Sequence, residues 1–202
     1  MSIKLNGATS GSVELDVPDA IGSDVRLTIP GAAGTLDRLE RAGNILQVVQ
    51  NHVTATSSVA VTAGSTFDIA VSASITPTYS SSKVLVRVRW CGEFNNISNH
   101  DMVFRLKRDG TLIGNPPSAG SRTTGISPIA QGFWDFDADS TPDSTWFEYL
   151  DSPNTTASVT YQMAGLTNSY SGTFFTNRAV TDSDSSGFER LTSGITLIEV
   201  AG

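Results

Sequence analysis

The sequence predicts an all-β protein in which short N-terminal strands and one short neck helix precede an antiparallel β-sandwich. The chain is rich in small polar residues, and only 16% of its 202 residues are charged. From residue 45 onward, short apolar or alternating segments are separated by turn residues, which is typical of a sandwich. No segment of that region has a helical apolar period. We therefore divide the chain into an N-terminal segment, residues 1–44, and a β domain, residues 45–202.

Two segments of the N-terminal region repeat each other at an offset of 12 residues. Ser12–Pro18 matches Asp24–Pro30, and in each segment apolar residues alternate with polar ones before a proline. This alternation predicts two short strands with one apolar face each, and the prolines end the pairing. A lone hairpin is marginal in water. The apolar faces must therefore pack either on the β domain or on other copies of the chain in an intertwined trimer.

The segment between Thr35 and Gly43 predicts a short helix that is followed at once by a strand. Thr35 is a suitable N-cap, and Gly43 is a suitable stop with positive φ. A helix of two turns is not stable alone, so its apolar stripe must be covered. The stripe either caps the following domain or forms a neck where three copies meet. The expected neck residues are Leu36, Leu39, Ala42 and Ile45.

Nine segments of the β domain are expected to be strands. Arg108-Asp109-Gly110 predicts a tight hairpin, because Asp-Gly favours positive φ at both turn positions. Lys83–Phe94 is expected to be a central strand, with valines on one side and Leu85, Arg87 and Arg89 on a wetter side. The expected strands are Ile45–Val53, Thr66–Val71, Lys83–Phe94, Met102–Lys107, Thr111–Gly114, Gly132–Phe136, Thr145–Leu150, Ala157–Met163 and Gly194–Val200.

This set of strands is similar in architecture to the jelly roll of tumour-necrosis-factor and complement-type trimers. The resemblance implies a homotrimer whose first and last strands lie near the three-fold axis. Ile45–Val49 and Ile195–Val200 would then be buried there.

Composition excludes several classes of protein. A net charge of -7 argues against a nucleic-acid partner, which needs a basic face. The single cysteine, Cys91, allows neither an intrachain disulfide nor a thiolate cluster, and it is expected to be a small buried residue. The N-terminus lacks the apolar region of a signal peptide, and no run approaches the ~18 apolar residues of a membrane span. We expect a soluble protein that is made in a cytoplasm and does not insert in membranes.

The first quarter of the chain resembles a known family. SIKLNGATSGSVELDVPDA, VRLTIPGAAGT and LDRLERAGNILQVVQ occur in this order, and together they resemble the N-terminal part of tail-fibre and related structural proteins of cyanophages and other marine phages. The resemblance implies a homotrimeric virion protein whose N-terminal segment binds other virion proteins. Two roles remain open: a tail fibre that attaches to the host, and a capsid decoration or cement protein or head fibre.

No catalytic constellation stands out, and we expect no enzyme, no cofactor and no metal. His52 and His100 lack further clear ligands. The acidic run Asp135–Asp139 offers carboxylates suited to calcium, but Ser140 and Trp146 stand where the calcium loop needs Gly and Glu.

Two aromatic clusters suggest a receptor-binding surface. Strand alternation assigns Phe133, Trp146 and Phe174 to the core and the aromatics of opposite parity to the outside or an interface. Outward aromatic rings beside acidic groups suit a host-surface glycan, although a core or subunit-interface role is the alternative. The candidate receptor-binding residues are Trp134, Asp135, Asp137, Tyr170 and Phe175.

Overall fold

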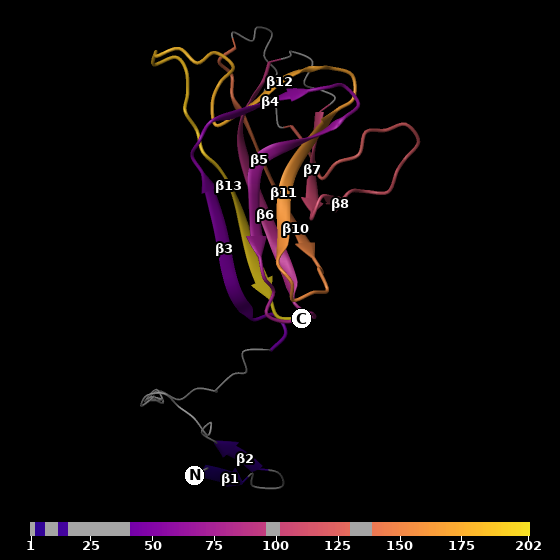
Figure 1. Ribbon diagram of the computed structural model, residues 1–202, viewed down its shortest axis with the longest axis vertical. Helices are drawn as coiled ribbons and strands as arrows, with labels where there is room; N and C mark the ends of the chain where they lie inside the picture. The colour runs from indigo at the N-terminus through magenta and orange to yellow at the C-terminus, as the bar shows by residue number, and fades with distance from the viewer. Residues whose placement is uncertain (1–2, 7–11, 16–40, 96–101, 130–138) are drawn as a thin grey trace. The chain divides into compact units, whose positions relative to one another are not determined.

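The computed structural model describes residues 3–6, 12–15, 41–95, 102–129 and 139–202, and these residues form strands and loops only. The chain divides into two compact units, Met1–Asp37 and Arg38–Gly202. The strands are drawn in Figure 1, which labels all of the described strands except β9 (Ser127–Pro128).

The N-terminal unit contains one described hairpin. Strand β1 (Ile3–Asn6) pairs antiparallel with β2 (Ser12–Leu15). A strand at residue 12 is therefore confirmed, but its partner is β1, whereas we expected the second repeat. That repeat, residues 24–30, and the neck positions Leu36 and Leu39 lie outside the described residues.

The C-terminal unit is a sandwich of two antiparallel sheets. In the first sheet, β3, β13, β6 and β10 lie side by side, and β12 and β4 extend it along the end of β6. In the second sheet the order is β5, β11, β7 and β8, with β9 beside β7. The bounds of the first sheet's strands are Ile45–Val53 (β3), Ser57–Val61 (β4), Lys83–Phe94 (β6), Asp143–Asp151 (β10), Gly172–Thr176 (β12) and Ser193–Val200 (β13). Those of the second are Thr66–Ile75 (β5), Met102–Arg108 (β7), Thr111–Ile113 (β8), Ser127–Pro128 (β9) and Val159–Thr167 (β11).

The strand orders β3-β13-β6-β10 and β5-β11-β7-β8 are those of an eight-stranded jelly roll. The prediction of an antiparallel, jelly-roll-like sandwich is confirmed, whereas the homotrimer stays a prediction. The tight hairpin is also confirmed, since Asp109 and Gly110 join β7 to β8 with φ values of 48° and 81°.

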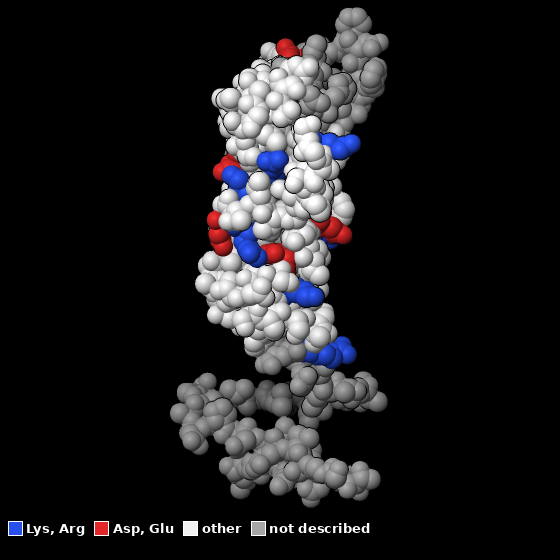
Figure 2. Space-filling view, turned by 90° about the vertical axis from the view of Figure 1, so that its right-hand side faces the viewer, with Lys and Arg blue, Asp and Glu red and all other residues white. Residues whose placement is uncertain are grey.

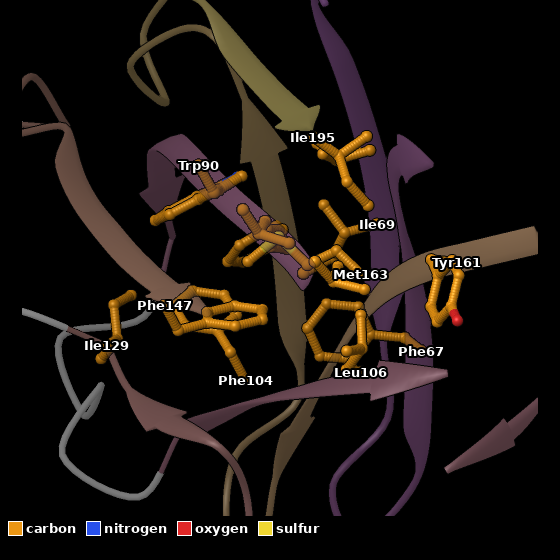
Figure 3. Close-up of a cluster of buried hydrophobic side chains, with 14 of the residues drawn as sticks. Phe67, Ile69, Trp90, Phe104, Leu106, Ile129, Phe147, Tyr161, Met163 and Ile195 are labelled. Atoms are coloured by element: carbon orange, nitrogen blue, oxygen red, sulfur yellow. The ribbon is translucent and has the colours of Figure 1, made fainter. Parts of the chain in front are cut away.

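The central strand β6 shows how sequence alternation builds the core. Its inward residues Val84, Val86 and Val88 are fully buried, while Arg87 and Arg89 on the opposite side are exposed. Beyond them, Trp90 stacks on Phe174 with ring centroids 4.6 Å apart. Figure 3 shows aromatic and aliphatic side chains of both sheets filling the space between them. Burial of Phe174 and Cys91 confirms two expectations.

One buried polar cluster joins the two sheets at the end of β10. Asp151 accepts hydrogen bonds from the Tyr161 hydroxyl at 2.7 Å and from an Arg108 guanidinium nitrogen at 2.8 Å. Burial, and then the bond to Asp151, raise the pKa of Tyr161 above its ordinary value. The phenol therefore remains a donor throughout the ordinary pH range. This cluster links β10 to β7 and β11 through hydrogen bonds to one buried carboxylate.

Candidate interaction surfaces

Residues 41–44 lead into the sandwich at the end where β3 begins and β13 finishes. The backbone N–H of Gly43 donates to Ala201 at 2.8 Å, and that of Ala201 donates to Asn44 at 2.8 Å. Gly43 has a φ of 90°, so the expected positive φ is confirmed. Of the predicted neck residues, Ala42 lies in an exposed turn and Ile45 is 62% exposed. Ile45 thus presents an apolar side chain at the junction.

A buried carboxylate holds this junction end together. Glu199 accepts hydrogen bonds from the Gln47 amide at 2.6 Å and from the backbone and hydroxyl of Thr78 at 2.6 and 2.9 Å. Burial alone would raise the pKa of Glu199, but the hydrogen bonds from Gln47 and Thr78 outweigh it and hold the pKa below its ordinary value. The β5–β6 loop is therefore tied to β3 and β13 by an ionised group.

The opposite end carries loops that are pinned by buried polar side chains. Glu93, at the end of β6, accepts from the backbone and hydroxyl of Thr141 at 3.1 and 3.0 Å and from the backbone of Val180 at 2.7 Å. The Thr181 N–H donates to the Asp139 carbonyl at 2.8 Å. One carboxylate therefore fixes the loop before β10 and the loop before β13 against each other.

A second buried side chain, that of Asn177, fixes the chain at the same end of the sandwich. Its amide nitrogen donates to the carbonyls of Val53 and Ala55 at 2.9 and 2.8 Å, and its oxygen accepts from the Ser193 hydroxyl at 2.7 Å. Asn177 is fully buried and has a φ of 64°, which Asn tolerates better than most residues. We call the segments 139–142, 168–171 and 177–192 the distal loops.

The distal loops contain part of the predicted receptor surface. Tyr170 lies there and is 36% exposed. Phe175 is only 9% exposed, and the guanidinium of Arg178 lies 4.2 Å from its ring centre. The prediction that Phe175 faces outward is therefore wrong, because the chain after β12 folds back and covers its ring. Trp134, Asp135 and Asp137 lie outside the described residues.

A depression of about 610 Å³ lies between two of the distal loops. It is lined mainly by Thr141, Pro142 and Asp143 on one side and by Glu189 and Leu191 on the other. Nearby, Asp182 pairs with both Arg178 and Arg190. Polar groups beside apolar carbons form a surface that can hold a polar ligand with an apolar face.

Trp146 was expected in the core, and this expectation is wrong. It is 53% exposed on the outer face of β10, because Thr145 and Phe147 take the inward positions. The guanidinium of Arg87 lies 5.3 Å from the Trp146 ring centre, and Glu148 lies 3.6 Å from Arg87. A shallow depression beside Trp146 is lined by Gln50, His52, Arg87, Arg89, Gly194 and Thr196.

Metal ligands and charged residues were compared across the part of the chain that the structure describes. Among the residues that the structure describes, no group of three or more His, Cys, Asp or Glu side chains could hold a metal ion. Basic and acidic residues are interspersed on the face shown in Figure 2, with no large patch of one sign. No helix in the described parts of the chain is long and apolar enough to cross a membrane.

The solved structures to which this chain is similar include two of infectious bursal disease virus. The VP2 subviral particle is 15% identical with a TM-score of 0.35, and the match covers 96% of this chain and 48% of that one. The Gt strain structure is 15% identical with a TM-score of 0.32, covering 96% and 47%. The chain thus spans about half the length of these structures. No protein-family model matches the chain, and no curated protein matches it.

Proposed function

We propose that this chain is a subunit of a homotrimeric phage tail fibre that attaches the virion to its host. Its N-terminal segment, residues 1–44, binds other virion proteins, and its jelly-roll domain binds a host-surface glycan. The order of the N-terminal motifs supports the virion role, as the resemblance to phage structural proteins implies. A jelly roll is compatible with this role, since the fold recurs in viral and sugar-binding proteins. The fold by itself does not select the role.

The observation that carries the attachment role is the position and rigidity of the distal loops. They lie at the end of the sandwich opposite the junction with the N-terminal segment (Figure 1). A segment committed to the virion leaves that opposite end free to meet the host. Because Glu93 already fixes the segments 139–142 and 177–192, and Asn177 fixes the start of the latter, a ligand that binds these two segments would lose little conformational entropy in ordering them.

The chemistry of the distal end suits a sugar better than a folded protein. Tyr170 offers an exposed ring face, and the neighbouring loops offer carboxylate and hydroxyl acceptors. Single sugar contacts are weak, so three sites on one trimer would raise the avidity only for a repeating receptor.

Competition for adsorption tests this proposal. Purified full-length protein, added to host cells before phage particles, should reduce adsorption in proportion to its concentration. Tyr170→Ala should weaken the competition. Leu112→Ala is the matched control, because Leu112 is equally exposed, at 37%, but lies on β8 away from the distal loops. Folded wild-type protein that does not compete while particles adsorb normally would refute the attachment role.

The capsid-decoration role is the second candidate, since jelly rolls are common in capsids. It predicts many copies per particle and no effect of the free protein on adsorption. Quantifying the chain against the major head protein in purified particles separates the two roles.

A further inference from the structure

We infer that the outer face of the β3-β13-β6-β10 sheet is the surface on which a second copy of this chain docks. The inference rests on the assembly part of the proposed function and not on host attachment. This face would form the interface between the jelly-roll domains of neighbouring copies.

The first observation is an apolar row that crosses all four strands. Strand register places Val48 opposite Ile198, Ile198 opposite Leu85, and Leu85 opposite Leu150. Val48 is 58% exposed and Leu150 is 50% exposed. Ile45 and Val200 form the start of the next row toward the junction. Contiguous exposed apolar side chains of this kind mark interaction sites on soluble proteins.

The second sheet provides an internal comparison. The outward side chains of β5, β7 and β11 are mainly polar, and they pair with one another within one copy. Lys107 lies 2.6 Å from Asp68, Arg105 donates to Thr66 at 2.8 Å, and Ser74 bonds Thr160 at 2.8 Å. Of the six large hydrophobic residues that the structure shows as exposed, four lie on the outer face of the first sheet and one, Leu112, on the second. The outer face of the first sheet thus carries exposed apolar side chains, whereas the outer face of the second sheet is mainly polar and is paired within one copy.

Charge points to a second copy as the occupant. Beyond the apolar row, the face carries Lys83, Arg87 and Arg89 against the single acidic residue Glu148. The whole chain has a net charge of -7, so the remaining surface of another copy is acidic overall. In a ring of copies, this basic face lies against the acidic remaining surface of a neighbouring copy. Opposite charges then face each other across the interface. Trp146 and Arg87 also belong to the residue types that are enriched in the centres of interfaces.

The apolar face extends to the place where the chain enters the domain. Ile45 follows directly after the junction, where Gly43 and Asn44 are hydrogen-bonded to Ala201. Ile45 is 62% exposed, so the exposed apolar face extends from the apolar row to the point where the chain enters the domain.

The test measures the mass of the full-length protein in solution. Wild-type protein should have about three times the chain mass of 21.3 kDa, and Val48→Lys with Leu150→Lys should shift it to the mass of one chain. Both side chains are exposed in a single copy, so the circular dichroism spectrum should not change. Ala70→Lys with Leu112→Lys introduces the same charges on exposed positions of the second sheet and should leave the trimer intact.

A second measurement avoids any doubt about folding of the lysine variants. Val48→Cys is a small change, and the natural Cys91 is buried. The new thiol should react with a thiol reagent more slowly than that of Leu112→Cys, and the difference should vanish when the trimer is diluted to single chains. Equal reaction rates in the trimer, or a trimer that persists in the lysine variant, would overturn the docking inference and leave the proposed function standing. A wild-type protein of one-chain mass would overturn both the inference and the proposed assembly, and would leave the attachment role to be judged by adsorption.

Discussion

Replacing Glu93 with alanine should loosen the distal loops and lower the stability of the jelly-roll domain. The Glu93 carboxylate is 3% exposed and accepts hydrogen bonds from the backbone N–H and the hydroxyl of Thr141 and from the backbone N–H of Val180. The substitution leaves two backbone N–H groups and one hydroxyl without this acceptor. It breaks the connection between the loop before β10 and the loop before β13.

The magnitude follows from the type and the burial of these bonds. Hydrogen bonds to charged groups contribute about 1.5–3 kcal/mol each when buried. Thr141 and Val180 are only half-buried, so water can replace part of what is lost. We expect Glu93→Ala to lower the free energy of unfolding by about 2–3 kcal/mol. For a domain of this size that corresponds to a fall in Tm of roughly 5–10 °C.

Urea unfolding, followed by circular dichroism, measures this difference, and limited proteolysis should show faster cleavage within residues 139–142 and 177–192. Glu148→Ala is the matched control, because Glu148 is a half-exposed carboxylate on the same sheet, paired with Arg87 at 3.6 Å. Exposed pairs of this kind contribute about 0–1 kcal/mol. If Glu93→Ala were no less stable than Glu148→Ala, the argument that Glu93 fixes the distal loops would be refuted.

Two further predictions concern the opposite end of the sandwich. Tyr161→Phe removes one hydrogen bond to the buried Asp151 and should cost about 1.5–3 kcal/mol in urea unfolding; an unchanged midpoint would mean that Arg108 alone satisfies the carboxylate. Because the pKa of Glu199 is held below its ordinary value of 4.5, its ionised form adds stability above that pH, and this contribution is lost as the pH falls through the lowered pKa. Glu199→Gln should therefore unfold with a smaller dependence on pH below about 4.5 than wild type, and an equal dependence in both proteins would contradict the assignment.

The strands whose sequence combined clear alternation with flanking turn residues were predicted well. Ile45–Val53 and Lys83–Phe94 have the bounds expected from their apolar pattern and from the turns beside them. Ser57–Val61 and Gly172–Thr176 were missed as strands, because both are short and depend on a distant partner. The end of β6 pairs with β12, which in turn pairs with β4. No local pattern reveals that pairing.

The orientation of the aromatic residues was harder to predict than the strands. Strand alternation separates two sets of side chains but does not say which set faces the core. For Trp146 a signal was present, since Glu148 shares its parity and a charged residue marks the outward side. For Phe175 no such signal existed, because its burial depends on Arg178 lying over the ring after the chain reverses. Tyr170 and the distal loops therefore form the candidate surface, and Phe175 does not belong to it.

Electron microscopy of phage particles bound by an antibody against residues 177–192 would show where the distal loops lie on the particle. This segment lies at the end of the jelly roll opposite the junction with the N-terminal segment. The tail-fibre account predicts label at the outer ends of the tail fibres, at few copies per particle, and loss of adsorption in the same preparation. Label spread over the head at many copies, with adsorption unchanged, would contradict it.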